Sequence, residues 1–178
     1  MARCVALVRG INVGGNKKLV MAEFREVLAG LGLTAVRTHL NSGNAVFTAD
    51  ATPAALEARI AAAVERELSL RVSCLVRTAA EVRAVLDGNP LLQPDRNGSR
   101  MFAVFLSAEP DAALRAAHDP AVLDPGHVAV GDRVVYQWCP DGLSAASDLG
   151  TFLARRWKVT VTARNWNTVT KLAALLEG

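Results

Sequence analysis

Hydrophobic and polar positions in the first 77 residues follow the order strand, helix, strand, strand, helix, strand. Strand-like alternation occurs at Arg3 to Arg9, 36–40, 45–48 and 72–76. Apolar residues recur at helical spacing in the two stretches between them, 21–31 and 53–68. The pattern therefore predicts a βαββαβ unit with a polar hairpin turn between its second and third strands.

Local signals support the helices and mark the end of this unit. Thr52 is a typical N-cap, and Pro53 is a typical first helical residue. Thr78 and Glu81 have the spacing of a capping box, which predicts a short connecting helix that ends at Gly88. The residues that follow, up to Ser99, are rich in Pro, Gly, Asn and Asp, as is typical of a linker.

The same order of elements recurs after residue 100. The predicted strands are 101–106, 128–130, 134–138 and 159–162, and the predicted helices are 110–117, 147–157 and a closing helix at 167–176. Gly131-Asp132 is the expected two-residue turn of the second hairpin. The halves share element order and spacing but no residue-level identity, so the sequence predicts a duplication on pattern alone.

The expected fold class is α+β, with two βαββαβ halves that form antiparallel sheets, a connecting helix and a C-terminal helix. The expected organisation is a first half at 1–77, a connecting helix and linker at 78–100, and a second half with the C-terminal helix at 101–178. In such a sheet, the loop after the first strand and the central hairpin turn lie at the same end. This geometry brings the segments 10–18 and 41–44 together and predicts a site there.

The glycine-rich segment from Arg9 to Lys18 follows a strand and precedes a helix, where backbone N–H groups and a helix N-terminus hold anions in many proteins. Gly10 and Gly15 have the spacing of a P-loop, but Asn16 and Lys17 stand where that motif needs Lys and Ser or Thr. A nucleotide triphosphatase is therefore not indicated. Two interpretations remain open, a tight turn with solvated lysines and a polar-ligand site. The ligand-binding candidates in this segment are Arg9, Asn12, Gly14, Gly15 and Lys17.

Two further polar segments supply candidates. Ser42 and Asn44 belong to the turn Asn41-Ser42-Gly43-Asn44, whose composition is that of many hairpin turns. Arg164, Asn165 and Asn167 surround Trp166 where the last strand passes into the closing helix. They form either a polar ligand surface with an aromatic platform or a packed helix start, in which Trp166 is buried and Asn167 or Thr168 is the cap.

Several classes of chemistry have no support in the sequence. Cys4, Cys74 and Cys139 have neither disulfide-framework nor zinc-site spacing, so no metal is predicted and a reducing compartment is expected. The histidines, His39, His118 and His127, are scattered with no carboxylate or cysteine at ligand spacing. No serine lies in a nucleophile motif. No leader or long apolar span is recognised, so we expect a cytoplasmic protein without a membrane partner.

Taken together, the segments Leu7 to Gly15, Asn41 to Asn44 and Arg164 to Val169 resemble the bacterial family known as domain of unknown function 1697 (DUF1697). The likeness covers nearly the whole chain. It implies a duplicated ferredoxin-like fold and no established activity. The family usually carries a Ser-Lys pair after the second hairpin, where this chain has Ser147-Asp148, so a lysine-dependent role for that segment is not expected.

The function that follows is binding of a polar or anionic small molecule at the glycine-rich loop, with no cofactor identified. One alternative is an enzyme of unknown reaction that uses the same pocket, with an acid or base among Asp141, Asp148 and Arg164. The sequence does not decide whether the protein is an enzyme or which oligomer it forms. A third alternative is a weak nucleic-acid-binding module.

We predict that the protein binds single-stranded RNA or DNA only weakly and without sequence preference. The formal charge is only +3, and the two central strands of the first half offer Phe47 as their sole aromatic for base stacking. Fluorescence anisotropy with labelled oligonucleotides at physiological salt checks this expectation. Submicromolar, sequence-selective binding would contradict it.

Overall fold

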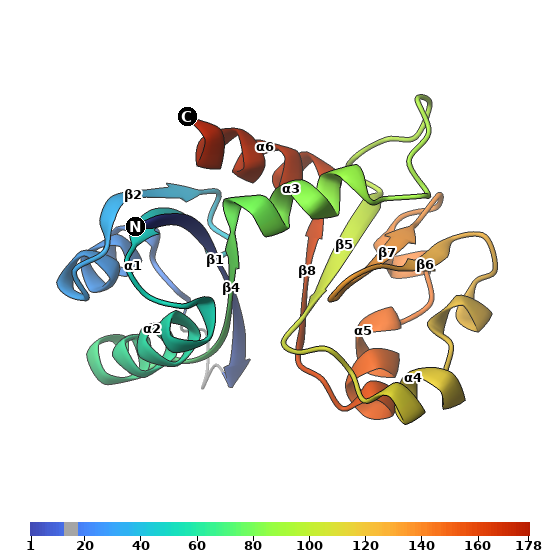
Figure 1. Cartoon of the computed structure of the whole chain (residues 1–178), viewed down its shortest axis with the longest axis horizontal. Coiled ribbons are helices and arrows are strands. Elements are labelled where there is room, and N and C mark those ends of the chain that lie inside the picture. Colours follow the sequence, from blue (N-terminus) through green and yellow to red (C-terminus); the bar gives the residue numbers. More distant parts are fainter. Residues whose placement is uncertain (13–17) are drawn as a thin grey trace. The chain divides into compact units, whose positions relative to one another are not determined.

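Two four-stranded antiparallel sheets form the framework of the chain (Figure 1). The computed structural model describes residues 1–12 and 18–178, except for the side chains of Ile11 and Asn12. The chain divides into two compact units, one made of 1–82 with 172–178 and the other made of 83–171. We call them unit 1 and unit 2. No helix within the described ranges has both the length and the apolar character needed to cross a membrane.

Unit 1 contains the first βαββαβ order. Its strands are β1 (Ala2–Asn12), β2 (Thr34–His39), β3 (Asn44–Ala49) and β4 (Arg71–Thr78), and its helices are α1 (Met21–Gly30) and α2 (Pro53–Leu68). The strands lie in the order β2-β3-β1-β4, and every neighbouring pair is antiparallel. This is the sheet order of the ferredoxin-like fold, as the resemblance implied.

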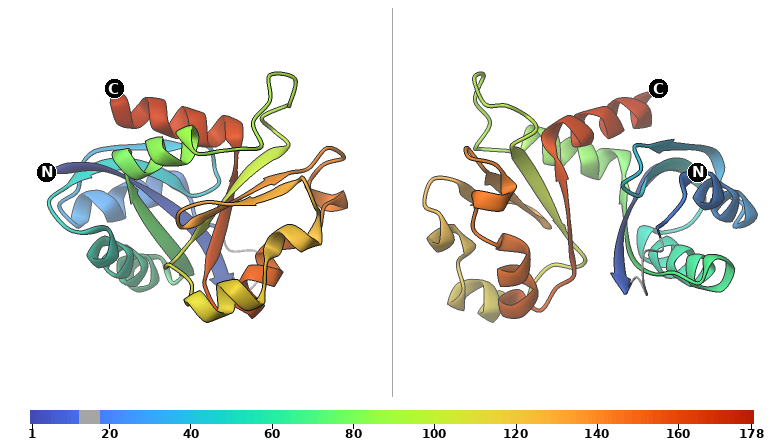
Figure 2. Two further views of the ribbon diagram at one scale, coloured as in Figure 1. Left: turned by 45° about the vertical axis from the view of Figure 1, so that its right-hand side comes forward. Right: turned by 180° about the vertical axis from the view of Figure 1, so that it is seen from behind.

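Side-chain alternation in β1 decides which face of this sheet is covered by helices. Cys4, Ala6 and Val8 are buried in one cluster with Phe24 of α1 and Ile60 of α2. The intervening residues of β1 therefore lie on the opposite face, because successive side chains of a strand point to opposite sides. The helices α1 and α2 lie together on one side of this sheet in Figure 2.

The helix starts predicted for unit 1 are confirmed. The Thr52 hydroxyl accepts a hydrogen bond from Ala55 N at 3.3 Å, and Pro53 is the first residue of α2. The capping box is reciprocal, since Glu81 N donates to Thr78 Oγ1 at 3.2 Å and Thr78 N donates to Glu81 Oε2 at 2.8 Å. The helix that follows, α3 (Ala79–Asp87), is the predicted connecting helix.

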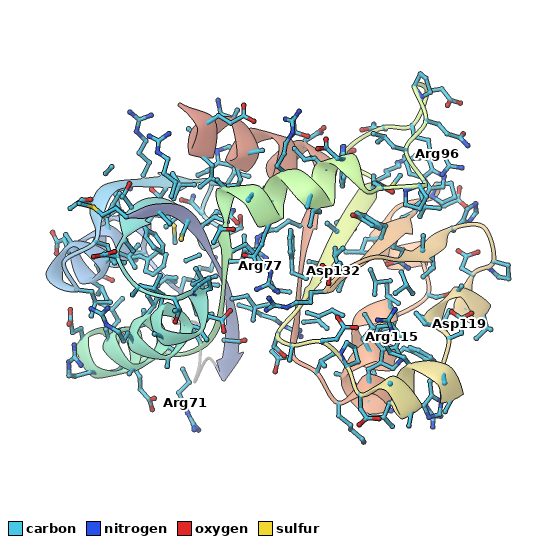
Figure 3. The ribbon with its side chains drawn as sticks, viewed as in Figure 1. Arg71, Arg77, Arg96, Arg115, Asp119 and Asp132 are labelled. Carbon is cyan, nitrogen blue, oxygen red and sulfur yellow. The ribbon has the colours of Figure 1, made fainter. Side chains whose placement is uncertain are left out.

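A side chain from α2 closes the outer edge of β4. The carboxylate of Glu57 accepts a hydrogen bond from Val76 N at 2.9 Å, while Val76 pairs with Ala6 of β1 on its other side. The guanidinium of Arg77, labelled in Figure 3, lies 3.6 Å from the same carboxylate and is 3% exposed. Glu57 therefore satisfies a buried backbone donor of the edge strand, since Val76 is 0% exposed and its N–H points away from β1.

Unit 2 repeats the order with shorter helices. Its strands are β5 (Met101–Leu106), β6 (Val128–Val130), β7 (Val134–Trp138) and β8 (Val161–Asn165), paired antiparallel in the order β6-β7-β5-β8. Its helical elements are α4 (Ala112–Ala117), η1 (Pro120–Leu123), η2 (Leu143–Ala145), α5 (Leu149–Phe152) and a π-helical turn η3 (Leu153–Trp157). The closing helix is α6 (Trp166–Glu177). The predicted α+β duplication is confirmed.

Several boundaries in unit 2 differ from the sequence prediction, and three of them have a clear physical reason. The turn of the second hairpin is Asp132-Arg133, because Gly131 still pairs with Val134 through an N–H···O bond of 2.8 Å and Arg133 takes the left-handed conformation. The predicted helix at 147–157 begins at Leu149, since Asp148 is its N-cap. The last strand runs to Asn165 instead of Thr162, because Arg164 and Asn165 pair with β5 although they break the apolar alternation.

We predict that Gly43→Ala destabilises the protein far more than Gly32→Ala. Both glycines have φ +80, but a Cβ at Gly43 would lie 2.8 Å from the Val8 carbonyl oxygen, whereas a Cβ at Gly32 has nothing within 4 Å. The left-handed conformation alone costs about 1 kcal/mol, and overpacking adds about 1 to 3 kcal/mol at Gly43. Urea denaturation of both variants measures the difference. Equal losses of unfolding free energy would show that the turn has room to move away from β1.

Candidate functional site

The end of β1 and the turn between β2 and β3 meet at one end of the unit 1 sheet. Leu7 stands opposite Asn44, and the next residue, Val8, donates its N–H to the Gly43 carbonyl at 2.8 Å. The end of β1 therefore lies beside this turn, while most of the predicted glycine-rich segment, 13–17, lies outside the described residues. Gly43 is itself buried against Val8, so the turn is pressed onto the central strand.

Asn44 locks this turn from within. Its side chain is fully buried, and its Nδ2 donates to the His39 carbonyl at 3.1 Å and to Ser42 Oγ at 2.8 Å. A buried amide needs such partners, because leaving it unpaired costs about 1 to 3 kcal/mol. Leu40, at the other side of the turn, has φ 59 and is 58% exposed. The sequence predicted Asn44 as a ligand contact, and the structure places it as the internal brace of the turn.

Arg9 lies beside this turn and is exposed. It follows Val8, whose side chain is in the helix-side cluster, so Arg9 emerges on the face of the sheet that α1 and α2 do not cover. On the other side of β1, its register partner is Ser73 of β4. Arg9 thus lies between Ser73 of β4 on one side of β1 and the turn that contains Ser42 on the other.

The N-terminus of α1 lies at the same sheet end. β1 and β2 both run antiparallel to β3, so α1, which joins them, must begin at the end where β1 finishes. Its N-cap is Val20, which supplies no side-chain hydrogen bond to the first turn, although the acidic Glu23 lies in that turn. The backbone N–H groups of this turn therefore face the sheet end, and Val20 itself does not cap them.

Four predicted site residues lie wholly or partly outside the described structure. Gly14, Gly15 and Lys17 fall in the segment 13–17, and the side chain of Asn12 is not described. The expectation for these positions rests on the sequence alone. Lys18, the next described residue, is exposed.

The three candidates near the C-terminus belong to unit 2 and have local structural partners. Arg164 is 9% exposed and donates to Thr162 Oγ1 at 2.8 Å and to the Ala163 carbonyl at 2.9 Å. Asn165 is the cap of α6, because its Oδ1 accepts from Thr168 N at 2.9 Å. The cap is therefore neither of the two residues that the sequence suggested. Asn167 is exposed and lies against Gly98.

Trp166 is packed and not displayed. It is 8% exposed, and its ring meets that of Tyr136 edge-on with centroids 6.2 Å apart. The hydroxyl of Tyr136 donates to the Val85 carbonyl at 2.8 Å, and burial raises the pKa of this phenol to about 12. The packed interpretation of this segment is the correct one for Trp166.

A histidine–carboxylate pair in unit 2 was missed by the sequence analysis. His127 Nδ1 lies 3.2 Å from both carboxylate oxygens of Asp124, so the expectation that no histidine has a carboxylate at suitable spacing is wrong for His127. The sequence signal was Asp-Pro-Gly-His, in which Pro125 and Gly126 turn the chain so that the first and fourth side chains meet. In the part of the chain that the structure describes, no group of three or more His, Cys, Asp or Glu is placed to hold a metal ion.

The cysteines are buried free thiols. Burial, with a smaller contribution from the charge of Asp124, raises the pKa of Cys139 to about 11. Burial and the charge of Glu81 raise the pKa of Cys4 in the same way. Both side chains are therefore protonated at neutral pH and are poor nucleophiles.

Comparison with known proteins gives a family. The sequence profile of a family described as protein of unknown function, DUF1697, matches residues 1–136. The chain belongs to the DUF1697 family. The matched range contains Arg9, the braced turn and the Asp124–His127 pair, and it ends before Arg164.

A solved structure extends the likeness over the whole chain. The conserved bacterial protein SP0830 from Streptococcus pneumoniae is 27% identical in sequence and has a TM-score of 0.70, with 98% of each chain covered. No curated protein matches the sequence. The DUF1697 description and this neighbour therefore establish family and fold and assign no activity.

We predict that Asn44→Asp destabilises this DUF1697 protein by about 3 kcal/mol at pH 7, because it buries a charge and replaces an amide donor with an oxygen that faces the His39 carbonyl. Asn41→Asp, at an exposed position of the same turn, is the control and should change stability by less than about 0.5 kcal/mol.

The effect of Asn44→Asp should also depend on pH. Burial raises the pKa of such an aspartate above its unfolded value, so the penalty is full at neutral pH and shrinks as the carboxylate is protonated toward about pH 4. Urea denaturation of wild type and variants at both pH values measures this. An equal penalty at both pH values would contradict the proposed burial of the charge.

Proposed function

We propose that the protein binds a small anionic or polar molecule at the end of the unit 1 sheet, beside Arg9. The observation that carries the proposal is the position of Arg9, an exposed guanidinium on a central strand, next to a turn fixed by the Val8–Gly43 hydrogen bond and by Asn44. A charged donor on an ordered strand is suited to recognition, because the backbone that carries it loses no conformational entropy when a ligand binds.

The chemistry of this end of the sheet favours an anion. A guanidinium binds carboxylate or phosphate oxygens in a planar, bidentate arrangement. Lys18 adds an exposed positive charge, and the first turn of α1 adds the positive end of a helix dipole without a capping side chain. Ser42 and Ser73 offer hydroxyl groups on either side of Arg9. The sequence-based candidates Asn12, Gly14, Gly15 and Lys17 would complete this site.

Arg164, Asn165 and Asn167 remain predicted ligand contacts, and no contact in unit 2 supports a ligand there. The enzyme alternative remains open, and among the described residues beside Arg9 we assign no acid or base. The nucleic-acid alternative loses its one stacking residue, because Phe47 is 2% exposed and lies in the helix-side cluster. We also propose a cytoplasmic location, on the composition of the sequence.

The test is a thermal-shift screen with inorganic phosphate, nucleotides, sugar phosphates and small carboxylates, followed by calorimetric titration of each hit. Arg9→Ala should weaken binding by roughly tenfold to a hundredfold, because a charge-assisted hydrogen bond contributes about 1.5 to 3 kcal/mol. Its unfolding temperature without ligand should stay close to that of wild type.

Arg66→Ala is the matched control. Arg66 is an exposed arginine of α2 that pairs only weakly with Glu67 at the surface, and its loss lowers the net charge by the same amount. It should bind each hit as wild type does. If Arg9→Ala also binds as wild type, or if both variants weaken binding equally, the ligand is not recognised at this sheet end.

A further inference from the structure

A pocket of about 250 Å³ lies in unit 2, at the open end of the β6–β7 hairpin. It is formed where the turn before β6 faces the turn after β7. Its lining residues are Asp124, His127, Cys139, Pro140, Asp141, Gly142, Ala145 and Ala146. All of them come from unit 2. The pocket is therefore independent of the site proposed beside Arg9.

The walls of this pocket are fixed by backbone hydrogen bonds. Trp138 N donates to the His127 carbonyl at 2.8 Å, which holds the two turns together beside the last pair of the hairpin. Cys139 N donates to the Arg100 carbonyl at 2.8 Å, and Gly142 N closes the second turn onto the Cys139 carbonyl at 3.0 Å. The pocket is thus formed before any ligand arrives.

Hydrogen bonds of Ser147 connect a third segment to the walls of the pocket. Ser147 Oγ donates to the Leu123 carbonyl at 3.3 Å, and the Ser147 carbonyl accepts from Gln137 Nε2 at 3.0 Å. Leu123 ends η1, whose N-cap is Asp119, labelled in Figure 3. Ser147 therefore positions the segment that carries Asp124.

The Asp124–His127 contact sets the hydrogen-bonding character of the imidazole. The carboxylate accepts at Nδ1, so the neutral ring carries its proton there and Nε2 is an acceptor. Both side chains are about one third exposed, at 33% and 35%, and are accessible to a small molecule. Both residues line the pocket and carry acceptor groups.

The other lining side chains add acceptors and negative charge. Asp141 is exposed at the pocket wall, and none of the eight lining residues is Lys or Arg. Arg100 is nearby, and its guanidinium donates to the Pro140 carbonyl. The Cys139 thiol is buried and protonated, which makes it a weak donor. Two carboxylates and an imidazole acceptor call for a ligand that brings donors and positive charge.

We propose that this pocket binds a small organic cation through a primary ammonium group. An ammonium has three donors, which match the oxygens of Asp124 and Asp141 and the Nε2 of His127. Leu143, directly after Gly142, is 54% exposed and offers an apolar surface for the carbon chain of the ligand. Alkylamines have this combination of charge and hydrocarbon.

The experiment uses n-butylammonium as the probe, with n-butanol and butyrate as neutral and anionic analogues of the same chain length. Amide resonances of the full-length protein are followed by NMR at about pH 8, where an ordinary imidazole is neutral and an alkylamine is charged. Butylammonium should shift the amides of Asp124, Gly126, His127, Cys139, Asp141 and Gly142 in a saturable manner, and the two analogues should not.

Two variants and a control test the role of the carboxylates. Asp141→Asn and Asp124→Asn should each weaken butylammonium binding by about fivefold, the effect of one partly exposed charge pair. Asp95→Asn removes an exposed carboxylate from a loop of the same unit that does not line the pocket, and should bind as wild type. Asp141 is exposed, so its substitution should leave folding unchanged.

The outcomes that overturn the proposal are distinct. Equal binding of n-butanol would mean that the pocket is only an apolar hollow. An equal loss of butylammonium affinity in Asp95→Asn would mean that long-range electrostatic attraction, and not contact with the pocket carboxylates, accounts for the binding. Saturable shifts with Zn²⁺ and none with butylammonium would make the pocket a metal site, and the absence of shifts with any probe would make it a structural gap.

Discussion

The contact between Gly43 and Val8 is the constraint on which the candidate site of unit 1 depends. One backbone hydrogen bond of 2.8 Å joins the hairpin turn to the central strand, and it forms only because residue 43 has no side chain. That contact sets the register in which Asn44 faces Leu7 and the Asn44 amide reaches the His39 carbonyl. Arg9, two residues further along β1, takes its place relative to the turn from the same register. A ligand site at this end is thus a consequence of strand pairing.

Most of the fold followed from side-chain periodicity, because a half-buried strand and an amphipathic helix each leave a repeating apolar signature. The capping signals at Thr52 and at Thr78 with Glu81 were equally local, and they form the predicted hydrogen bonds. Prediction failed where a local pattern competed with tertiary pairing. Arg164 and Asn165 are polar, yet they extend β8 because β5 offers backbone partners opposite them.

The roles of individual polar residues were harder to predict than their positions. Asn44 and Asn165 were expected to contact a ligand, and the structure shows one bracing a turn and the other capping a helix. A ligand contact and a structural hydrogen bond both satisfy a side-chain amide, so the residue type alone does not distinguish the two roles. The Asp124–His127 pair was missed for the opposite reason. Asp124 and His127 are three positions apart in the sequence, and only the folded Pro-Gly turn between them brings their side chains together.

Glu57 gives the edge of the unit 1 sheet a further property. An open edge strand with the buried, apolar residues of β4 is a template onto which another extended chain can add, as in amyloid and in strand-swapped dimers. The carboxylate occupies the Val76 amide that such an added strand would need, and a negative charge there repels a backbone carbonyl. A single acidic residue on α2 therefore occupies a backbone position that strand addition at this edge would require.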